Sequence, residues 1–395
     1  MIQGVWVPKL RRVALRAAVF LFASIVSFSI AEGIARLVAP YPISYPWVDQ
    51  VNGIVAPLPN VHGRHFVPGI YDTTFSFNPQ RFRGQQVYTA EPGPQVIRIA
   101  ILGASSAFGT GANDVDAYPA QLQSLLQERA TQSGLNLTFE VINAAIPGTV
   151  VAEQALWYQN WVKRFHPQVV VLNIACVADY VTGMFSMDAS GRATPRTLGE
   201  LQAANKGPGT VRHVAMHVPG YIFLAEHSEL FNLLELKLGE VFRRRRNAAL
   251  ANQSAPQEPI GVPGRVQEDA LLLETAEVMW LKKQVEESGG RLALVLLPCR
   301  ENIYSPSSLQ GEEIQQGYAA VVVALRDLAV KEGILFAEVA PTLRKTATHS
   351  QQALYYDGRF ETHPTPAGYR VIAKEVAAFL LESGILLTPE NSRAP

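Results

Sequence analysis

Apolar and polar positions follow two alternating patterns along most of this chain. Short runs that are almost wholly apolar, such as Val96–Leu102 and Val169–Ile174, are typical of buried parallel strands. Longer segments with an apolar residue every three or four positions, such as Tyr118–Gln132, are typical of amphipathic helices. Further strands are expected over Thr138–Ile142, Arg291–Leu297 and Ile334–Glu338, and further helices over Val151–Arg164, Glu268–Ser288, Glu312–Glu332 and Pro366–Ser383.

Strands and helices that alternate in this way predict an α/β domain over residues 96–385, with 386–395 as a tail. Its expected architecture is a three-layer, doubly wound parallel sheet with helices on both faces. An insertion at about 184–265 interrupts the alternation of strands and helices. It is helix-like over Phe223–Phe242. The hypothesis for its role is that of a lid over the cleft. Its four consecutive arginines, Arg243–Arg246, fit either an anionic headgroup site or a solvated helix end.

Residues 1–38 have the pattern of a membrane segment. The run Ala17–Ala31 carries no charge, and it becomes long enough to span a bilayer if Arg16 extends its charge to the surface. Basic residues precede it at Lys9, Arg11, Arg12 and Arg16, which predicts a cytoplasmic N-terminus. The alternative is a signal peptide cleaved after Ser29–Ala31. Both interpretations place the rest of the chain on the extracytoplasmic, periplasmic side.

Residues 39–95 are rich in proline, glycine and aromatic residues, and they predict an extended linker with short strands. The whole chain is 48% apolar and 17% charged with no net formal charge, which gives no reason to expect a nucleic-acid partner. The two cysteines, Cys176 and Cys299, show no metal-ligand spacing. They are expected as two buried, unlinked side chains, with a disulfide as the alternative. No motif indicates a metal or an organic cofactor.

A candidate nucleophile follows the first strand of the α/β domain. Gly103 and Ala104 come directly after Val96–Leu102, and two serines, Ser105 and Ser106, come next. Open α/β sheets build their sites at the carboxyl ends of their strands, and a helix N-terminus there stabilises negative charge. The serine is therefore either a nucleophile or an ordinary cap on a strand–helix turn.

A serine nucleophile needs a base, and His363 is the candidate. It lies on a polar, proline-punctuated loop before the last predicted helix, where the chain returns to the carboxyl edge of the sheet. Glu361 and Asp357 are both close enough in sequence to orient its imidazole. The oxyanion of a tetrahedral intermediate needs hydrogen-bond donors, for which the backbone N–H groups of Ser105 and Gly148 are candidates.

In this order the segments resemble the SGNH hydrolase superfamily, the GDSL-type lipases and esterases. The Gly-Asp-Ser block of that superfamily corresponds to Gly103–Ser105, and its oxyanion glycine corresponds to Gly148. Two positions depart from the pattern. Ala178 stands where the third block has an asparagine donor, and Phe360 stands where the last block, Asp-x-x-His, has its acid.

The segment Glu361–His363 is similar instead to the Asp-x-His form of relatives that acetylate exopolysaccharides. Asn78–Gly84 and Leu297–Tyr304 look like the membrane-anchored branch of the superfamily. The resemblance implies a flavodoxin-like sheet with Ser105 as nucleophile and His363 as base.

Three functions are compatible with these residues. The first is an extracytoplasmic serine esterase that acts on acyl groups of a sugar or lipid. The second is an O-acyltransferase that modifies an envelope polysaccharide from the same site. The third is a catalytically impaired glycan-binding or scaffolding module, which the departures at Ala178 and Phe360 favour. The expected partners are an acylated carbohydrate or lipid and the membrane.

Overall fold

The computed structural model describes residues 6–38, 40, 42–45, 47–51, 53–176, 185–188, 190–196, 214–235, 237–238, 263–304, 309–358 and 362–386. The chain divides into two compact units. The first contains Met1–Ile43 and Val211–Glu258, and the second contains Ser44–Thr210 and Pro259–Pro395.

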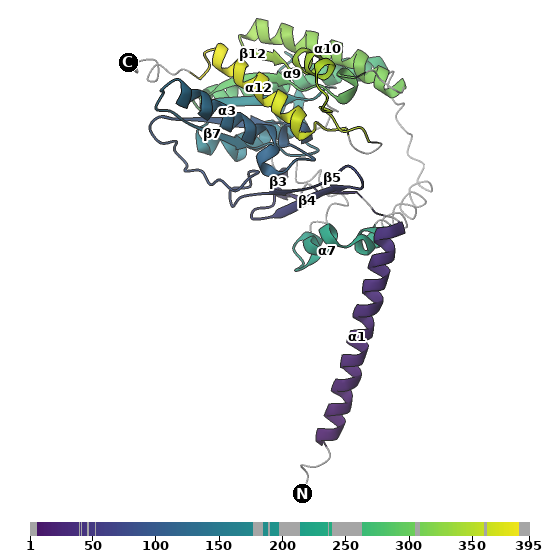
Figure 1. Ribbon diagram of the computed structural model, residues 1–395. Helices are drawn as coiled ribbons and strands as arrows, with labels where there is room; N and C mark the ends of the chain where they lie inside the picture. The colour runs from purple at the N-terminus through teal and green to yellow at the C-terminus, as the bar shows by residue number, and fades with distance from the viewer. Residues whose placement is uncertain are drawn as a thin grey trace. The chain divides into compact units, whose positions relative to one another are not determined.

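A five-stranded sheet forms the centre of the second unit (Figure 1). Its strands are β6 (Val96–Leu102), β7 (Thr138–Asn143), β8 (Val169–Ile174), β11 (Arg291–Leu296) and β12 (Leu335–Glu338). They lie in the order β12-β11-β8-β6-β7, and every neighbouring pair is parallel. This is the flavodoxin-like order, which places a topological switch point between β6 and β8. The predicted fold class is therefore confirmed.

Helices cover both faces of this sheet because alternate strand residues point to opposite sides. On one face, Leu102, Leu172 and Leu294 share a buried cluster with residues of three helices. These helices are α4 (Val151–Asn160), α9 (Pro263–Glu287) and α10 (Leu309–Glu332). On the other face, α3 (Tyr118–Gln132) packs against β7 and against α12 (Pro366–Glu382).

Several elements begin or end where the apolar pattern predicts. The bounds of β6, α3 and β8 are those expected, and α12 begins at Pro366 as expected. The helix α4 ends earlier than predicted, at Asn160, because a 3-10 turn follows it. The helix α11 (Ala340–His349) was not expected, since most of its residues are polar and only Ala340 and Leu343 are buried.

Residues 39–95 do contain short strands, but part of this stretch belongs to the core. Phe82 and Tyr88 are buried in the cluster beneath α4, which the low helical periodicity of the segment did not indicate. The remaining strands are β1 (Ile43–Ser44), β2 (Val48–Val51), β3 (Ile54–Pro57), β4 (His62–Val67), β5 (Tyr71–Ser76), β9 (Phe185–Met187) and β10 (Ala193–Pro195). The pairs β2–β3, β4–β5 and β9–β10 are antiparallel.

The first unit contains α1 (Trp6–Val38), within which Arg11–Val38 is long and apolar enough to cross a membrane. It also contains α7 (Tyr221–His227), which overlaps the start of the helix-like part predicted for the insertion, Phe223–Phe242. The short elements of the second unit are α2 (Ser105–Phe108) and the 3-10 turns η1 (Asp114–Asp116), η2 (Val162–Phe165) and η3 (Arg300–Asn302).

Candidate active site

Ser105 is the first residue of α2, directly beyond the carboxyl end of β6. The turn between them depends on Gly103, whose φ of +153° is unfavourable for residues with a side chain. A Cβ atom on Gly103 would lie 2.4 Å from Cβ of Ala107 and 2.9 Å from Cβ of Asn173. The tight turn from β6 into α2 therefore requires glycine at position 103. This turn places Ser105 at the edge of the sheet.

His363 meets Ser105 across this edge. Its Nε2 atom lies 2.8 Å from Oγ of Ser105. The loop that carries the histidine is held by backbone hydrogen bonds on both sides: Tyr356 N–H donates to the carbonyl of His363, and Thr365 N–H donates to the carbonyl of Leu354. Thr365 also caps the N-terminus of α12. The histidine is thus positioned by the strand-like return of its loop and by the start of the last helix.

Of the two candidate acids, Asp357 and Glu361, the structure describes only Asp357. Asp357 is 81% exposed, and its Oδ1 forms an ion pair with Nη2 of Arg300 at 2.9 Å. The structure thus directs this carboxylate to Arg300. Glu361 lies outside the described residues, as do Ala178 and Phe360, the two positions that depart from the superfamily pattern.

A cavity of about 250 Å³ opens beside the Ser–His pair. Its lining comes from the carboxyl ends of three strands and from the histidine loop. The described residues that line it are Ala104, Ser105, Ser106, Ala107, Asn173, Ile174, Ala175, Cys176, Leu297, Pro298, Cys299, Tyr355, Thr362 and His363. A site with a hydroxyl, an imidazole and an otherwise mainly apolar wall suits an acyl group.

Cys176 and Cys299 form a disulfide across this wall. The expectation of two unlinked cysteines is therefore wrong, and the alternative holds. Their Cα atoms lie 5.4 Å apart, because parallel pairing brings the ends of β8 and β11 together although 123 positions separate the two residues in sequence. The bond ties the two strand ends that form one side of the cavity.

Asn173 is a buried polar residue of this site that the sequence analysis did not single out. Its Nδ2 donates to the carbonyl of Leu102 at 2.8 Å, and its Oδ1 accepts from the hydroxyl of Tyr118 at 2.9 Å. Burial raises the pKa of Tyr118, so this hydroxyl keeps its proton and remains a donor. The signal available in the sequence was a single polar residue within the apolar run Val169–Ile174.

Gly148 lies on the loop after β7, which runs beside the Ser105 turn. The N–H of Ile146 donates to the carbonyl of Gly103 at 2.9 Å. Gly148 has a φ of +77° and is not among the described residues that line the cavity. The backbone N–H of Ser105 belongs to the first turn of α2, where no intrahelical acceptor exists.

Arg83 supports the segment that follows Ser105. It is buried, and its guanidinium donates to the carbonyls of Phe108, Gly109 and Ala112 at 2.6–2.8 Å. Its Nε donates to Asp114 at 2.9 Å. Burial lowers the pKa of Arg83, and the carboxylate of Asp114 opposes that shift. The arginine of the Asn78–Gly84 segment is thus an internal brace for the nucleophile turn.

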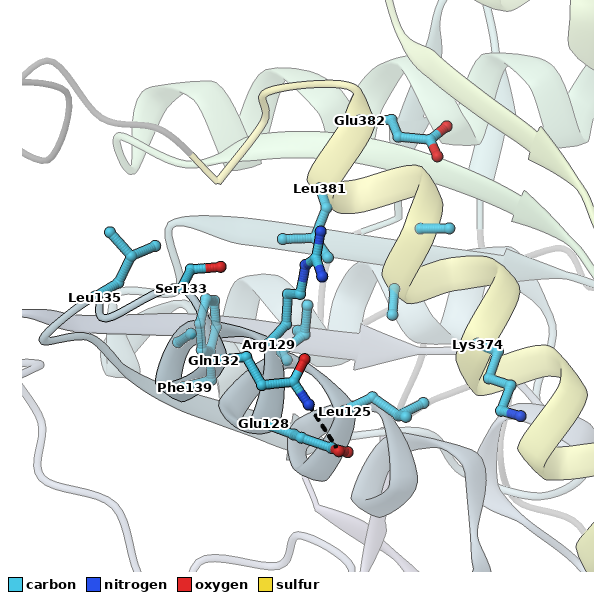
Figure 2. Close-up of a pocket in the computed structure, with 14 residues that line it drawn as sticks. Leu125, Glu128, Arg129, Gln132, Ser133, Leu135, Phe139, Lys374, Leu381 and Glu382 are labelled. Atoms are coloured by element: carbon cyan, nitrogen blue, oxygen red, sulfur yellow. Dashed lines mark hydrogen bonds between the residues drawn. The ribbon is translucent and has the colours of Figure 1, made fainter.

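A second, larger hollow lies away from this pair. It has a volume of about 610 Å³ and lies between the C-terminal halves of α3 and α12, where Leu125, Arg129, Lys374 and Leu381 line it (Figure 2). Its lining includes no histidine or cysteine and shares no residue with the smaller cavity. The nucleophile–base pair makes the smaller cavity the candidate active site.

Residues 265–393 match the family model of the SGNH hydrolase-like domain of the acetyltransferase AlgX. The matched part contains His363 and the last two strands of the five-stranded sheet, β11 and β12. No curated protein sequence matches the chain.

Solved structures with a similar chain path include a lipolytic protein of the G-D-S-L family from Desulfitobacterium hafniense, with 12% sequence identity and a TM-score of 0.38, covering 72% of this chain and 99% of that one. Another is a variant of an acetyl xylan esterase from Geobacillus stearothermophilus, with 13% identity and a TM-score of 0.39, covering 76% and 99%.

The resemblance of the sequence to the SGNH hydrolase superfamily is supported by this family match, which covers residues 265–393. The chain contains an SGNH hydrolase-like domain, as the sequence predicted, with a doubly wound sheet in the order expected for it. Its matched C-terminal part, residues 265–393, is similar to the SGNH hydrolase-like domain of an acetyltransferase.

Proposed function

We propose that this protein is a membrane-anchored serine esterase that cleaves acyl esters of a sugar or lipid outside the cytoplasm. The observation that carries the proposal is the hydrogen bond between Ser105 Oγ and His363 Nε2 at the mouth of a mainly apolar cavity. A hydroxyl in contact with a base is the arrangement that nucleophilic acyl transfer requires.

In the proposed reaction, Ser105 Oγ attacks the acyl carbon while His363 accepts its proton. The tetrahedral intermediate collapses to an acyl-enzyme, and the imidazolium returns its proton to the departing alcohol. Water then attacks the acyl carbon with His363 again as base, which releases the acid and restores the serine. Backbone N–H groups of Ser105 and Gly148 are the proposed oxyanion donors, and Glu361 is the proposed partner that orients the imidazole.

Two features support an extracytoplasmic location. The disulfide between Cys176 and Cys299 suits an oxidising compartment. The basic residues ahead of the apolar part of α1 favour a cytoplasmic N-terminus with the following domain on the other side.

Transfer of the acyl group to a carbohydrate hydroxyl is the second candidate activity. The family match to an acetyltransferase domain favours it, and so does the spacing of Glu361 and His363. The first half of the reaction is the same, and a sugar hydroxyl takes the place of water in the second half.

The test uses the full chain in detergent with a fluorophosphonate probe and p-nitrophenyl acetate. Ser105→Ala should abolish labelling and turnover. Ser106→Ala is the matched control, because Ser106 lines the same cavity one position further along α2, and it should keep both. Adding short polysaccharide acceptors and measuring acylated sugar against free acid then distinguishes transferase from esterase.

A folded wild-type protein that neither labels nor turns over would reject the catalytic proposal in favour of a binding module. Labelling lost in Ser106→Ala but kept in Ser105→Ala would reassign the nucleophile.

A further inference from the structure

The first unit contains a helical segment that buries small and polar side chains and exposes large apolar ones. It covers residues 214–238, with residue 236 outside the described part, and contains α7 and a helical stretch at 229–235. Its buried side chains are small or polar: Ala225, Glu226, Ser228, Glu229 and Asn232. Its exposed side chains include six large apolar ones, Val214, Val218, Phe223, Leu224, Leu234 and Leu238, beside the polar His217, His227 and Lys237. A helix packed on a protein core and facing water has the reverse distribution.

The bend between the two helical parts is attached to α1. The carboxylate of Glu32 accepts hydrogen bonds from Oγ of Ser228 at 2.7 Å and from the N–H groups of Glu229 and Leu230 at 3.0 and 3.1 Å. These N–H groups belong to the first turn of the stretch 229–235, so Glu32 supplies the acceptor that a helix N-terminus lacks.

Arg36 supplies hydrogen-bond donors to the other side of the same bend. Its Nη2 donates to the carbonyl of His227, the last residue of α7, at 2.7 Å, and its Nε donates to Glu32 at 2.8 Å. One ion pair on α1 thus partners backbone groups at the end of one helix and at the start of the next. Backbone polar groups must be satisfied by protein partners in this way where water is scarce, as it becomes toward the hydrocarbon region of a bilayer.

The attachment point lies at the end of the apolar part of α1. Glu32 follows the uncharged run Ala17–Ala31 directly, and the exposed side chains of Ile34 and Leu37 continue the apolar surface beyond it. Figure 1 shows α7 beside this C-terminal end of α1. A bilayer spanned by α1 would therefore have its interface at the level of the bend.

We propose that residues 214–238 form an interfacial collar, which inserts its apolar side chains into the phospholipid surface at the C-terminal end of α1. The proposal rests on the membrane anchor proposed above. The collar exposes large apolar side chains and is hydrogen-bonded to the end of an apolar helix long enough to span a membrane, which identifies lipid as the occupant. An amphipathic segment buried at the headgroup–acyl boundary in this way would add a second attachment to the membrane beside the single span.

The test measures the depth of nitroxide labels in the full chain, reconstituted in bilayers of phosphatidylcholine and phosphatidylglycerol. The native cysteines are joined in a disulfide, so an introduced cysteine is the thiol that reacts with the label. Phe223→Cys and Leu234→Cys probe the collar. Leu21→Cys, on the exposed surface of α1, is the control within the span, and Val330→Cys, 81% exposed on α10, is the control in the second unit.

Labels at 223 and 234 should collide several-fold more often with oxygen than with a water-soluble nickel chelate, as the label at 21 should, whereas the label at 330 should favour the chelate. Chelate access at 223 and 234 with lipid access at 21 would overturn the collar and leave the anchor intact. Exclusion of both reagents at 223 and 234 would also overturn it, since protein would then cover these side chains. Chelate access at 21 would instead reject the anchor.

A second variant tests the attachment. Glu32→Ala should increase the mobility of the label at 223 several-fold and leave the label at 21 unchanged, because the bend loses its acceptor. Ile34→Ala, an exposed position on the same turn of α1, is the matched control and should leave both labels unchanged. Equal mobility at 223 in Glu32→Ala and Ile34→Ala would contradict the docking through Glu32.

Discussion

At the scale of single residues, the candidate site depends on contacts between distant positions. Ser105 and His363 are 258 positions apart, yet their side chains are joined by a hydrogen bond. A residue two positions from each of them shapes the local backbone. Gly103 permits the tight turn into α2, and the side chain of Thr365 caps α12. These two turns orient the side chains locally, and the fold brings the two turns together.

The first prediction concerns the acid that orients His363. Glu361→Gln should lower the rate of fluorophosphonate labelling by on the order of 10³–10⁴-fold, the loss expected when the imidazole is held in the wrong tautomer. Asp357→Asn should leave the rate near that of the wild type, since this exposed carboxylate pairs with Arg300. The reverse order of the two rates would assign Asp357 as the acid.

The second prediction concerns Arg83. Arg83→Ala removes the donor to three carbonyls and leaves Asp114 without its buried partner. Losing one member of a buried pair costs about 3–5 kcal/mol of unfolding free energy. Arg64→Ala is the control, because the Arg64–Asp72 pair is partly exposed and is expected to contribute about 0–1 kcal/mol. Denaturant unfolding of both variants measures the difference, and equal losses would argue against the bracing role of Arg83.

At the scale of elements, the cavity is built by strand ends. The carboxyl ends of β6, β8 and β11 meet at one edge of the sheet because all three strands are parallel neighbours. Ser105 follows β6, and Asn173 is the last residue but one of β8. The disulfide joins Cys176, which follows β8, to Cys299, which follows β11. The sheet order therefore determines which loops surround the acyl-sized cavity.

The third prediction concerns the disulfide. Replacing both Cys176 and Cys299 by alanine should lower the free energy of unfolding by about 2–4 kcal/mol, since the crosslink closes a long loop. Reductant should destabilise the wild type by a similar amount and should have no effect on the double variant. A reductant effect of the same size on both proteins would show that the crosslink is not its cause.

At the scale of the whole molecule, the chain joins a membrane-type helix to an SGNH hydrolase-like domain. The part of α1 that fits a span, Arg11–Val38, has none of its most apolar window buried in protein. Its length and composition make this helix a candidate for a membrane span.

The fourth prediction concerns the N-terminus. An uncleaved anchor predicts that the purified protein retains residues before Ala31 and stays with the membrane during an alkaline carbonate wash. Mass spectrometry of the intact chain and immunoblotting of the wash fractions measure both. A mature N-terminus at Glu32, with the protein released by the wash, would identify a cleaved signal peptide instead.

The sequence by itself determined the order of strands and helices and the two residues most suited to acyl chemistry. These features are local, because burial of a strand or helix face is written in residues one to four positions apart. The bounds of β6, α3 and β8 and the choice of Ser105 and His363 as candidates required no more than that. The helix α11 was missed because it is short and has few apolar residues.

Only the tertiary structure decided which distant groups meet. The hydrogen bond of His363 to Ser105, the pairing of Asp357 with Arg300 and the Cys176–Cys299 disulfide all join loops that follow different elements. So do the contacts that Asn173 makes with its neighbours. Such pairings depend on strand order and loop path, which bring together residues far apart in the chain and which no local pattern encodes.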